Sequence, residues 1–171
     1  MNEHSFVKAV HRKLPSDVYR WKIHDTFTGG VPDAMYAGPA GLVFAEYKYL
    51  KTLPKKPTTL IKNGLTPLQI QWLERMSLYN ILVLAIIGSP LGGVVLTESF
   101  GANLTLHDFD HAMLITDVAG VIYELTHDNE ERIRLSRSRP KPATHLEQVQ
   151  RRTQNHASLS RRKTRHGSEC F

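Results

Sequence analysis

The sequence has little cysteine and no long apolar run, and each absence excludes a class of protein. Of its 171 residues only Cys170 is a cysteine, so no disulfide can form within the chain. The segment that opens Met-Asn-Glu-His has no apolar signal core. The longest apolar run, residues 81–87, is far too short to cross a bilayer and is typical of a buried strand. We therefore expect a soluble, cytoplasmic protein that does not bind a membrane.

Acidic residues are scarce near the end of the chain. Residues 137–171 contain nine basic and two acidic residues, a net charge of +7, and because the whole chain carries +6, residues 1–136 carry −1. Large apolar residues are also few there, which predicts a mostly disordered segment. Such a segment is consistent with a DNA-binding arm that uses Arg161, Arg162 and Lys163, and equally with a solubilising terminus.

The order of the predicted elements is typical of an α/β domain with a mixed sheet. Residue spacing predicts helices over 2–14 and from Thr66 to about Tyr79, with strands over 18–24, 33–36, 42–49, 81–87 and 94–97. Strands 42–49 and 81–87 flank a long helix, so we expect them to be parallel neighbours. Residues 104–135 predict one or two peripheral helices. The expected organisation is a core over 1–98, a helical extension over 99–136 and a basic tail over 137–171.

Three charged residues lie on a predicted β-hairpin within residues 29–48. Asp33 begins the first strand after a Gly-Gly-Val-Pro turn, and Glu46 and Lys48 lie two residues apart near the end of the second. Residues two apart in a strand project from the same face. The hairpin can therefore place two carboxylates and one ammonium group together.

The strand that carries Glu46 and Lys48 has two largely apolar faces, which predicts an interior position in the sheet. Charged residues there are costly unless they have a partner or a role. Mg²⁺ prefers one or two carboxylates with waters and other oxygens, so Asp33, Glu46 and the Tyr47 backbone carbonyl could bind this ion. Lys48 would then position or deprotonate the attacking water. A structural ion pair between Glu46 and Lys48 remains the alternative.

A lysine-rich loop follows the hairpin. Residues 51–64 include four lysines and no acidic residue; the lysines are Lys51, Lys55, Lys56 and Lys62. Because the loop follows directly on the candidate site, it could hold a polyanion such as DNA over it. An ordinary solvated loop would have the same composition.

In their order along the chain, three motifs resemble the PD-(D/E)xK nuclease superfamily. They are Gly-Val-Pro-Asp ending at Asp33, Glu-Tyr-Lys from Glu46 to Lys48, and Leu-Thr-Pro-Leu-Gln ending at Gln69. Within the superfamily they look like the phage-type branch, akin to VRR-NUC domains and Holliday-junction resolvases. The resemblance covers roughly residues 3–97.

The resemblance implies a restriction-endonuclease-like core and DNA cleavage that depends on Mg²⁺ or Mn²⁺. It implies that Asp33 and Glu46 are metal ligands, that Lys48 is the catalytic lysine and that Gln69 is an accessory polar residue. It also implies that Glu3 assists the metal site from the first helix.

Two classes of function follow from the sequence. The first is a metal-dependent DNA endonuclease, either selective for junctions and other branched DNA or general. The second is a DNA-binding or assembly protein that keeps the nuclease fold without turnover. Cleaving both strands of a symmetric junction requires two sites, so a homodimer is expected, with the apolar stretch 112–125 as a candidate interface.

Overall fold

The computed structural model describes residues 1–25 and 27–138. In this part of the chain five strands form one mixed sheet in the order β1-β2-β3-β4-β5. The predicted α/β class, with a mixed sheet flanked by helices, is confirmed. The strands are β1 (Tyr19–Lys22), β2 (Ala34–Gly38), β3 (Gly41–Tyr49), β4 (Leu82–Ser89) and β5 (Gly92–Leu96), and the helices are α1 (Glu3–Lys13), α2 (Pro67–Leu78), α3 (Leu106–Asp110), α4 (Ile115–His127) and α5 (Asn129–Ser138).

The centre of the sheet is the pair β3 and β4, which run parallel as predicted. The other neighbouring strands are antiparallel. A parallel connection needs a crossover, and α2 supplies it between β3 and β4. All eight residues of β4 are buried, which agrees with the continuous apolar run in the sequence. β3 lies between β2 and β4, so the interior position predicted for it is confirmed.

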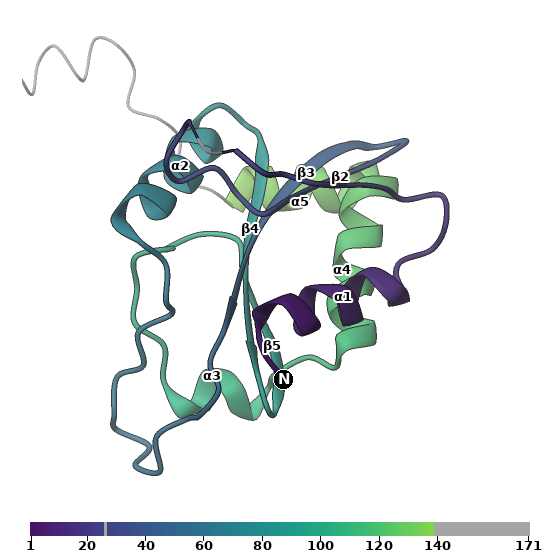
Figure 1. Cartoon of the computed structure of the whole chain (residues 1–171). Helices are drawn as coiled ribbons and strands as arrows, with labels where there is room; N and C mark the ends of the chain where they lie inside the picture. Colours follow the sequence, from purple (N-terminus) through teal and green to yellow (C-terminus); the bar gives the residue numbers. More distant parts are fainter. Residues whose placement is uncertain (26, 139–171) are drawn as a thin grey trace, which may run out of the picture. The chain divides into compact units, whose positions relative to one another are not determined.

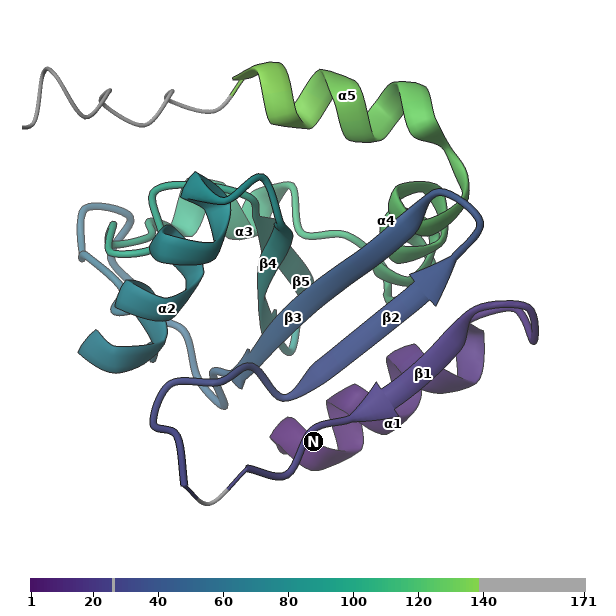
Figure 2. The ribbon, with the colours of Figure 1, turned by 90° about the horizontal axis from the view of Figure 1, so that it is seen from above.

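Two apolar clusters cover the two faces of the sheet. On one face α1 and α4 pack against alternate residues of β3, including Val43, Ala45 and Tyr47. On the other face α2 and the segment around α3 pack against Val83, Ala85 and Ile87 of β4. Figures 1 and 2 show α2 on the side of the sheet opposite α1 and α4. The alternation along β3 thus assigns its Glu46 and Lys48 to the face covered by α2.

Edge strand β1 is uncovered on the side that faces away from α1. Tyr19 and Trp21 are 60% and 55% exposed. These residues form the predicted apolar face of the strand, but α2 packs over β4 and does not reach it. The apolar face of β1 is therefore exposed to solvent.

Helix α4 belongs to the main core. Val118, Ala119, Ile122 and Leu125 of α4 are buried together with residues of β2, β3 and β4. Of the two alternatives for this region, packing on the sheet or on a partner, the structure has the first. These four residues are therefore occupied in the core, while Met113 and Leu114 of the stretch 112–125 are exposed, and a dimer interface there stays a prediction. The predicted basic tail lies almost entirely outside the described residues.

Within residues 1–25 and 27–138, none of the helices has the length and apolarity needed to cross a membrane.

The predicted boundary after residue 98 implies that residues 1–98 fold without α4. We expect a fragment of residues 1–98 not to unfold cooperatively, because removing α4 exposes an apolar face of the sheet. A fragment of residues 1–138 should unfold in a single transition. Urea denaturation followed by circular dichroism measures both. A cooperative transition in the shorter fragment would contradict this expectation and support the boundary.

Candidate metal site

The β2–β3 hairpin places Asp33 opposite Glu46. Ala34 pairs with Ala45 in the antiparallel register, so one further residue brings Asp33 and Glu46 face to face. Opposite residues in an antiparallel pair project from the same face of the sheet. The structure therefore brings together the two carboxylates that the sequence singled out.

The antiparallel ladder ends at this point, which leaves a backbone oxygen beside the carboxylates. Asp33 Oδ2 accepts a hydrogen bond from the Tyr47 backbone N–H over 2.9 Å. Extending the register sets Tyr47 opposite Pro32, which has no N–H to donate to the Tyr47 carbonyl. The N–H and carbonyl of one strand residue point to the same side. The Tyr47 carbonyl therefore lies next to Asp33 without a ladder partner.

The Glu46 side chain is 1% exposed, and its two oxygens have different surroundings. Oε1 accepts hydrogen bonds from Lys48 Nζ and from Gln69 Nε2, each over 2.5 Å. Oε2 is buried and has no hydrogen-bond partner in the part of the chain that the structure describes. Buried polar atoms are nearly always satisfied, because an unpaired one costs free energy. The two donors therefore hold the carboxylate so that one oxygen is left for a ligand.

The pKa of the Glu46 carboxyl reflects this enclosure. Burial above all, and then the negative charges of Asp33 and Glu3, raise it to about 7 against the lowering effect of Lys48. Burial lowers the pKa of Lys48, but its hydrogen bond to Glu46 and the neighbouring acids outweigh this effect and raise the pKa overall. Lys48 is thus held in its charged form by the carboxylates around it.

Helix α2 begins with a motif that also positions Gln69. Thr66 is the N-cap residue, and Pro67 occupies the first turn, where its missing N–H costs nothing. Gln69 Oε1 closes the capping box by accepting from the Thr66 N–H over 2.9 Å. Its amide nitrogen then donates to Glu46. One side chain thus connects the cap of α2 to the candidate site.

The turn before Asp33 requires a glycine at position 30. Gly30 has φ +86°, and a Cβ there would stand 2.4 Å from the Leu68 backbone oxygen. The backbone of the turn therefore lies directly against the first turn of α2. This contact sets the distance between the strand that carries Asp33 and the helix that carries Gln69.

Glu3 is the first residue of α1, and its charge contributes to the pKa shifts of both Glu46 and Lys48. Among residues 1–25 and 27–138, however, no group of three or more His, Cys, Asp or Glu side chains is placed to hold a metal ion. The role of Glu3 as a ligand stays a prediction.

The lysine-rich loop lies between β3 and α2, with Lys51, Lys55, Lys56 and Lys62 exposed. Buried Asn63 anchors its end by donating to the Phe100 carbonyl over 2.7 Å. A Cβ on Gly64 would stand 3.4 Å from Lys48 Cδ, so the loop passes directly over the Lys48 stem. DNA contact by these lysines stays a prediction, and Arg161, Arg162 and Lys163 lie outside the described residues.

Sequence reasoning missed two features that support the site. One is Pro32, whose missing N–H frees the Tyr47 carbonyl; its place directly before Asp33 was the available signal. The other is a buried chain of hydrogen bonds from His11 Nε2 to the Tyr36 hydroxyl over 2.7 Å and from there to the Tyr47 hydroxyl over 2.6 Å. This chain fixes Tyr47 from the opposite face of the sheet, and no local pattern predicts it.

The oxygen atoms of Asp33, Glu46 and the Tyr47 carbonyl suit a hard divalent cation. Two carboxylates and one carbonyl converge, and Glu46 Oε2 is an acceptor without a protein donor in the described residues. Mg²⁺ and Mn²⁺ prefer oxygen ligands, and Mg²⁺ in particular is often bound by only one or two carboxylates. Asp33, Glu46 and Tyr47 could therefore hold such an ion.

No family model matches the sequence, and no curated protein matches it either. Among solved structures, the chain is similar to Hjc, a Holliday junction resolvase from Archaeoglobus fulgidus. The TM-score is 0.46 at 11% sequence identity, and the alignment covers 68% of this chain and 96% of that chain.

Replacing Gly30 with alanine tests the contact between the turn and α2. We expect Gly30→Ala to lower the free energy of unfolding by about 2 kcal/mol or more, because its positive φ and its backbone contact both disfavour a side chain. Gly29→Ala is the matched control, since its Cβ would meet only the Leu68 side chain, 3.0 Å away. Urea denaturation measures both variants. Equal losses would show that the close approach at Gly30 does not constrain the site.

Proposed function

We propose that this protein is a metal-dependent DNA endonuclease that hydrolyses phosphodiester bonds, with branched DNA such as junctions as its substrate. The observation that carries the proposal is the Glu46 carboxylate, buried opposite Asp33 with one oxygen held by two donors and the other unpartnered within the described residues. A structural ion pair between Glu46 and Lys48 would need neither a second carboxylate opposite it nor an empty acceptor position. The preference for branched DNA follows from the motif resemblance alone.

Asp33, Glu46 and the Tyr47 carbonyl would hold Mg²⁺ or Mn²⁺. When bound, the ion would supply Lewis-acid polarisation of a phosphoryl oxygen and a lowered pKa for the attacking water. Gln69 acts through Glu46: its amide fixes the carboxylate while its carbonyl is tied to Thr66. It is a positioning residue.

Lys48 supplies positive charge. Its raised pKa keeps the ammonium group protonated at neutral pH, so it is suited to donating to a phosphoryl oxygen or to the attacking water. The sequence left open whether Lys48 positions or deprotonates the water, and the direction of this pKa shift favours positioning. The exposed lysines of residues 51–64 would bind the DNA backbone beside it.

We also propose that the active form is a homodimer, since cutting both strands of a symmetric junction requires two centres. The buried side chains of α4 are occupied in the core, so within the stretch 112–125 only exposed residues such as Met113 and Leu114 could take part in the contact.

The decisive experiment compares the wild-type protein with Lys48→Ala on labelled junction, flap and linear duplex DNA in Mg²⁺ or Mn²⁺. We expect the wild type to cleave and Lys48→Ala to lose about 10²-fold or more in rate, because charge stabilisation in the transition state is lost. Lys13→Ala, an exposed lysine at the end of α1, is the control and should cleave normally. Identical cleavage by wild type and Lys48→Ala, or DNA binding without cleavage by the wild type, would sink the proposal.

Metal binding should depend on pH because Glu46 must lose its proton to bind a cation. With a pKa of about 7, the carboxyl is mostly protonated at pH 6 and mostly ionised at pH 8, so Mn²⁺ affinity should rise about tenfold between these values. Electron paramagnetic resonance of free Mn²⁺ measures the affinity without DNA. Glu46→Gln should abolish the binding, whereas Glu74→Gln, at an exposed position of α2, should leave the pH dependence intact. An affinity that is the same at both pH values would exclude Glu46 as a ligand.

A further inference from the structure

A hollow lies beside α1 and β1, outside the candidate metal site. Its volume is about 410 Å³, and it is lined by Ser5, Lys8, His11, Arg12 and Arg20. We call it the α1–β1 hollow. Ser5, Lys8 and Arg12 are spaced three and four residues apart, so they share one stripe of the helix. The hollow is thus walled by one face of α1 and by a side chain of the edge strand.

The Arg20 guanidinium is anchored at this hollow. Its Nη1 donates to the backbone carbonyl of His11 over 2.5 Å, and Arg20 pairs with Tyr36 in the sheet register. Tyr36 faces α1, so Arg20 does so as well. A guanidinium held by one of its donors keeps its other N–H groups available for a ligand.

The positive charge of the α1–β1 hollow is not compensated. None of its lining residues is acidic. None of the ion pairs within the described residues involves Lys8, Arg12 or Arg20. The pKa of His11 agrees with this charge. It is lowered mainly by burial and then by the positive charges of Arg20 and Lys22. The hollow therefore combines three cations with a neutral imidazole.

Positive charge extends from the hollow along β1 toward the start of β2, and the metal site lies at that end of β2, on the opposite face of the sheet. Lys22 lies two residues after Arg20, on the same face of β1, and pairs with Ala34, the neighbour of Asp33. Lys8 and Arg12 are five and nine residues along α1 from Glu3, which is about 7 to 14 Å of helix. Because one DNA strand rises about 3.4 Å per nucleotide, this corresponds to about two to four nucleotides.

We propose that the α1–β1 hollow binds a backbone phosphate of the DNA strand, about two to four nucleotides from the bond that is cleaved. This inference rests on the proposed nuclease function. Guanidinium and ammonium groups are the usual partners of phosphate oxygens. No aromatic side chain other than the His11 imidazole lines the hollow, so it is built for the backbone and not for stacking a base. Contacts with the backbone position DNA without reading its sequence.

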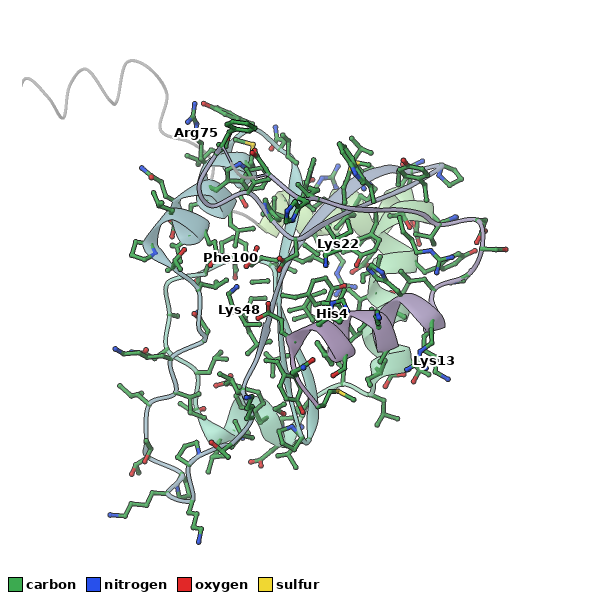
Figure 3. The ribbon with its side chains drawn as sticks, viewed as in Figure 1. His4, Lys13, Lys22, Lys48, Arg75 and Phe100 are labelled. Carbon is green, nitrogen blue, oxygen red and sulfur yellow. The ribbon has the colours of Figure 1, made fainter. Side chains whose placement is uncertain are left out.

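The test is DNA binding by the double variant Lys8→Ala/Arg12→Ala. Both side chains are exposed, so the fold should be retained, which circular dichroism checks. The control is Lys13→Ala/Arg75→Ala, which removes the same charge from exposed residues outside the hollow; Figure 3 shows Lys13 at the far end of α1 and Arg75 on α2. Fluorescence anisotropy with junction and duplex DNA is measured over a range of salt concentrations, with Ca²⁺ in place of Mg²⁺ to prevent cleavage.

We expect the hollow variant to bind DNA at least about tenfold more weakly than the control. The slope of its log affinity against log salt concentration should also be shallower, by the equivalent of about one to two phosphate contacts. Shortening the DNA to one nucleotide on either side of the cut should remove the difference. Equal affinities of the two double variants would overturn the proposal, as would a wild type that binds inorganic phosphate at these residues, seen by NMR, while DNA affinity is unchanged in the hollow variant.

These outcomes are distinct from those for the nuclease proposal. If the wild type fails to cleave any DNA, the nuclease function fails, but the binding comparison still decides whether the hollow contacts a DNA backbone. If the wild type cleaves and the two double variants bind alike, the nuclease function stands and the hollow has no part in it.

Discussion

The arrangement of the site depends on one buried carboxylate. Glu46 lies on an interior strand, where an ionised side chain is unfavourable unless its environment compensates for lost hydration. Lys48 and Gln69 compensate at one oxygen and leave the other unpartnered within the described residues. Each neighbouring element contributes to this condition: α2 supplies the amide, the lysine-rich loop covers the Lys48 stem, and the hairpin brings Asp33 opposite. A cation at the free oxygen would complete the compensation.

The second constraint is the parallel pair at the centre of the sheet. A parallel connection has to leave the sheet and return, so α2 necessarily crosses one face between β3 and β4. Its first turn meets the glycine turn before Asp33, at Gly30. The opposite face is closed by α1 and α4, and His11 of α1 and Tyr36 of β2 form the hydrogen-bond chain there that fixes Tyr47. The topology of the sheet thus places the start of α2 beside the first residue of β2 and the last residues of β3.

Positive charge surrounds this site on two sides. The lysines of residues 51–64 follow β3, and the α1–β1 hollow lies along α1, which begins at Glu3. The edge strand also exposes Tyr19 and Trp21 on the face away from α1. A substrate with many phosphates would be held from both directions, whereas a small ligand would contact only one of these surfaces.

The sequence by itself determined the strands, the parallel pair, the assignment of faces along β3 and the grouping of Asp33, Glu46 and Lys48, because these follow from residue periodicity and turn residues, which are local. The place of Gln69 in this group was implied by the motif resemblance alone. It did not determine that α4 packs in the main core or that the apolar face of β1 is exposed, since burial depends on which element covers a face. The free Tyr47 carbonyl, the unpartnered Glu46 oxygen and the bond of Arg20 to α1 also came only from the tertiary structure, because each depends on which residues distant in the chain lie next to one another.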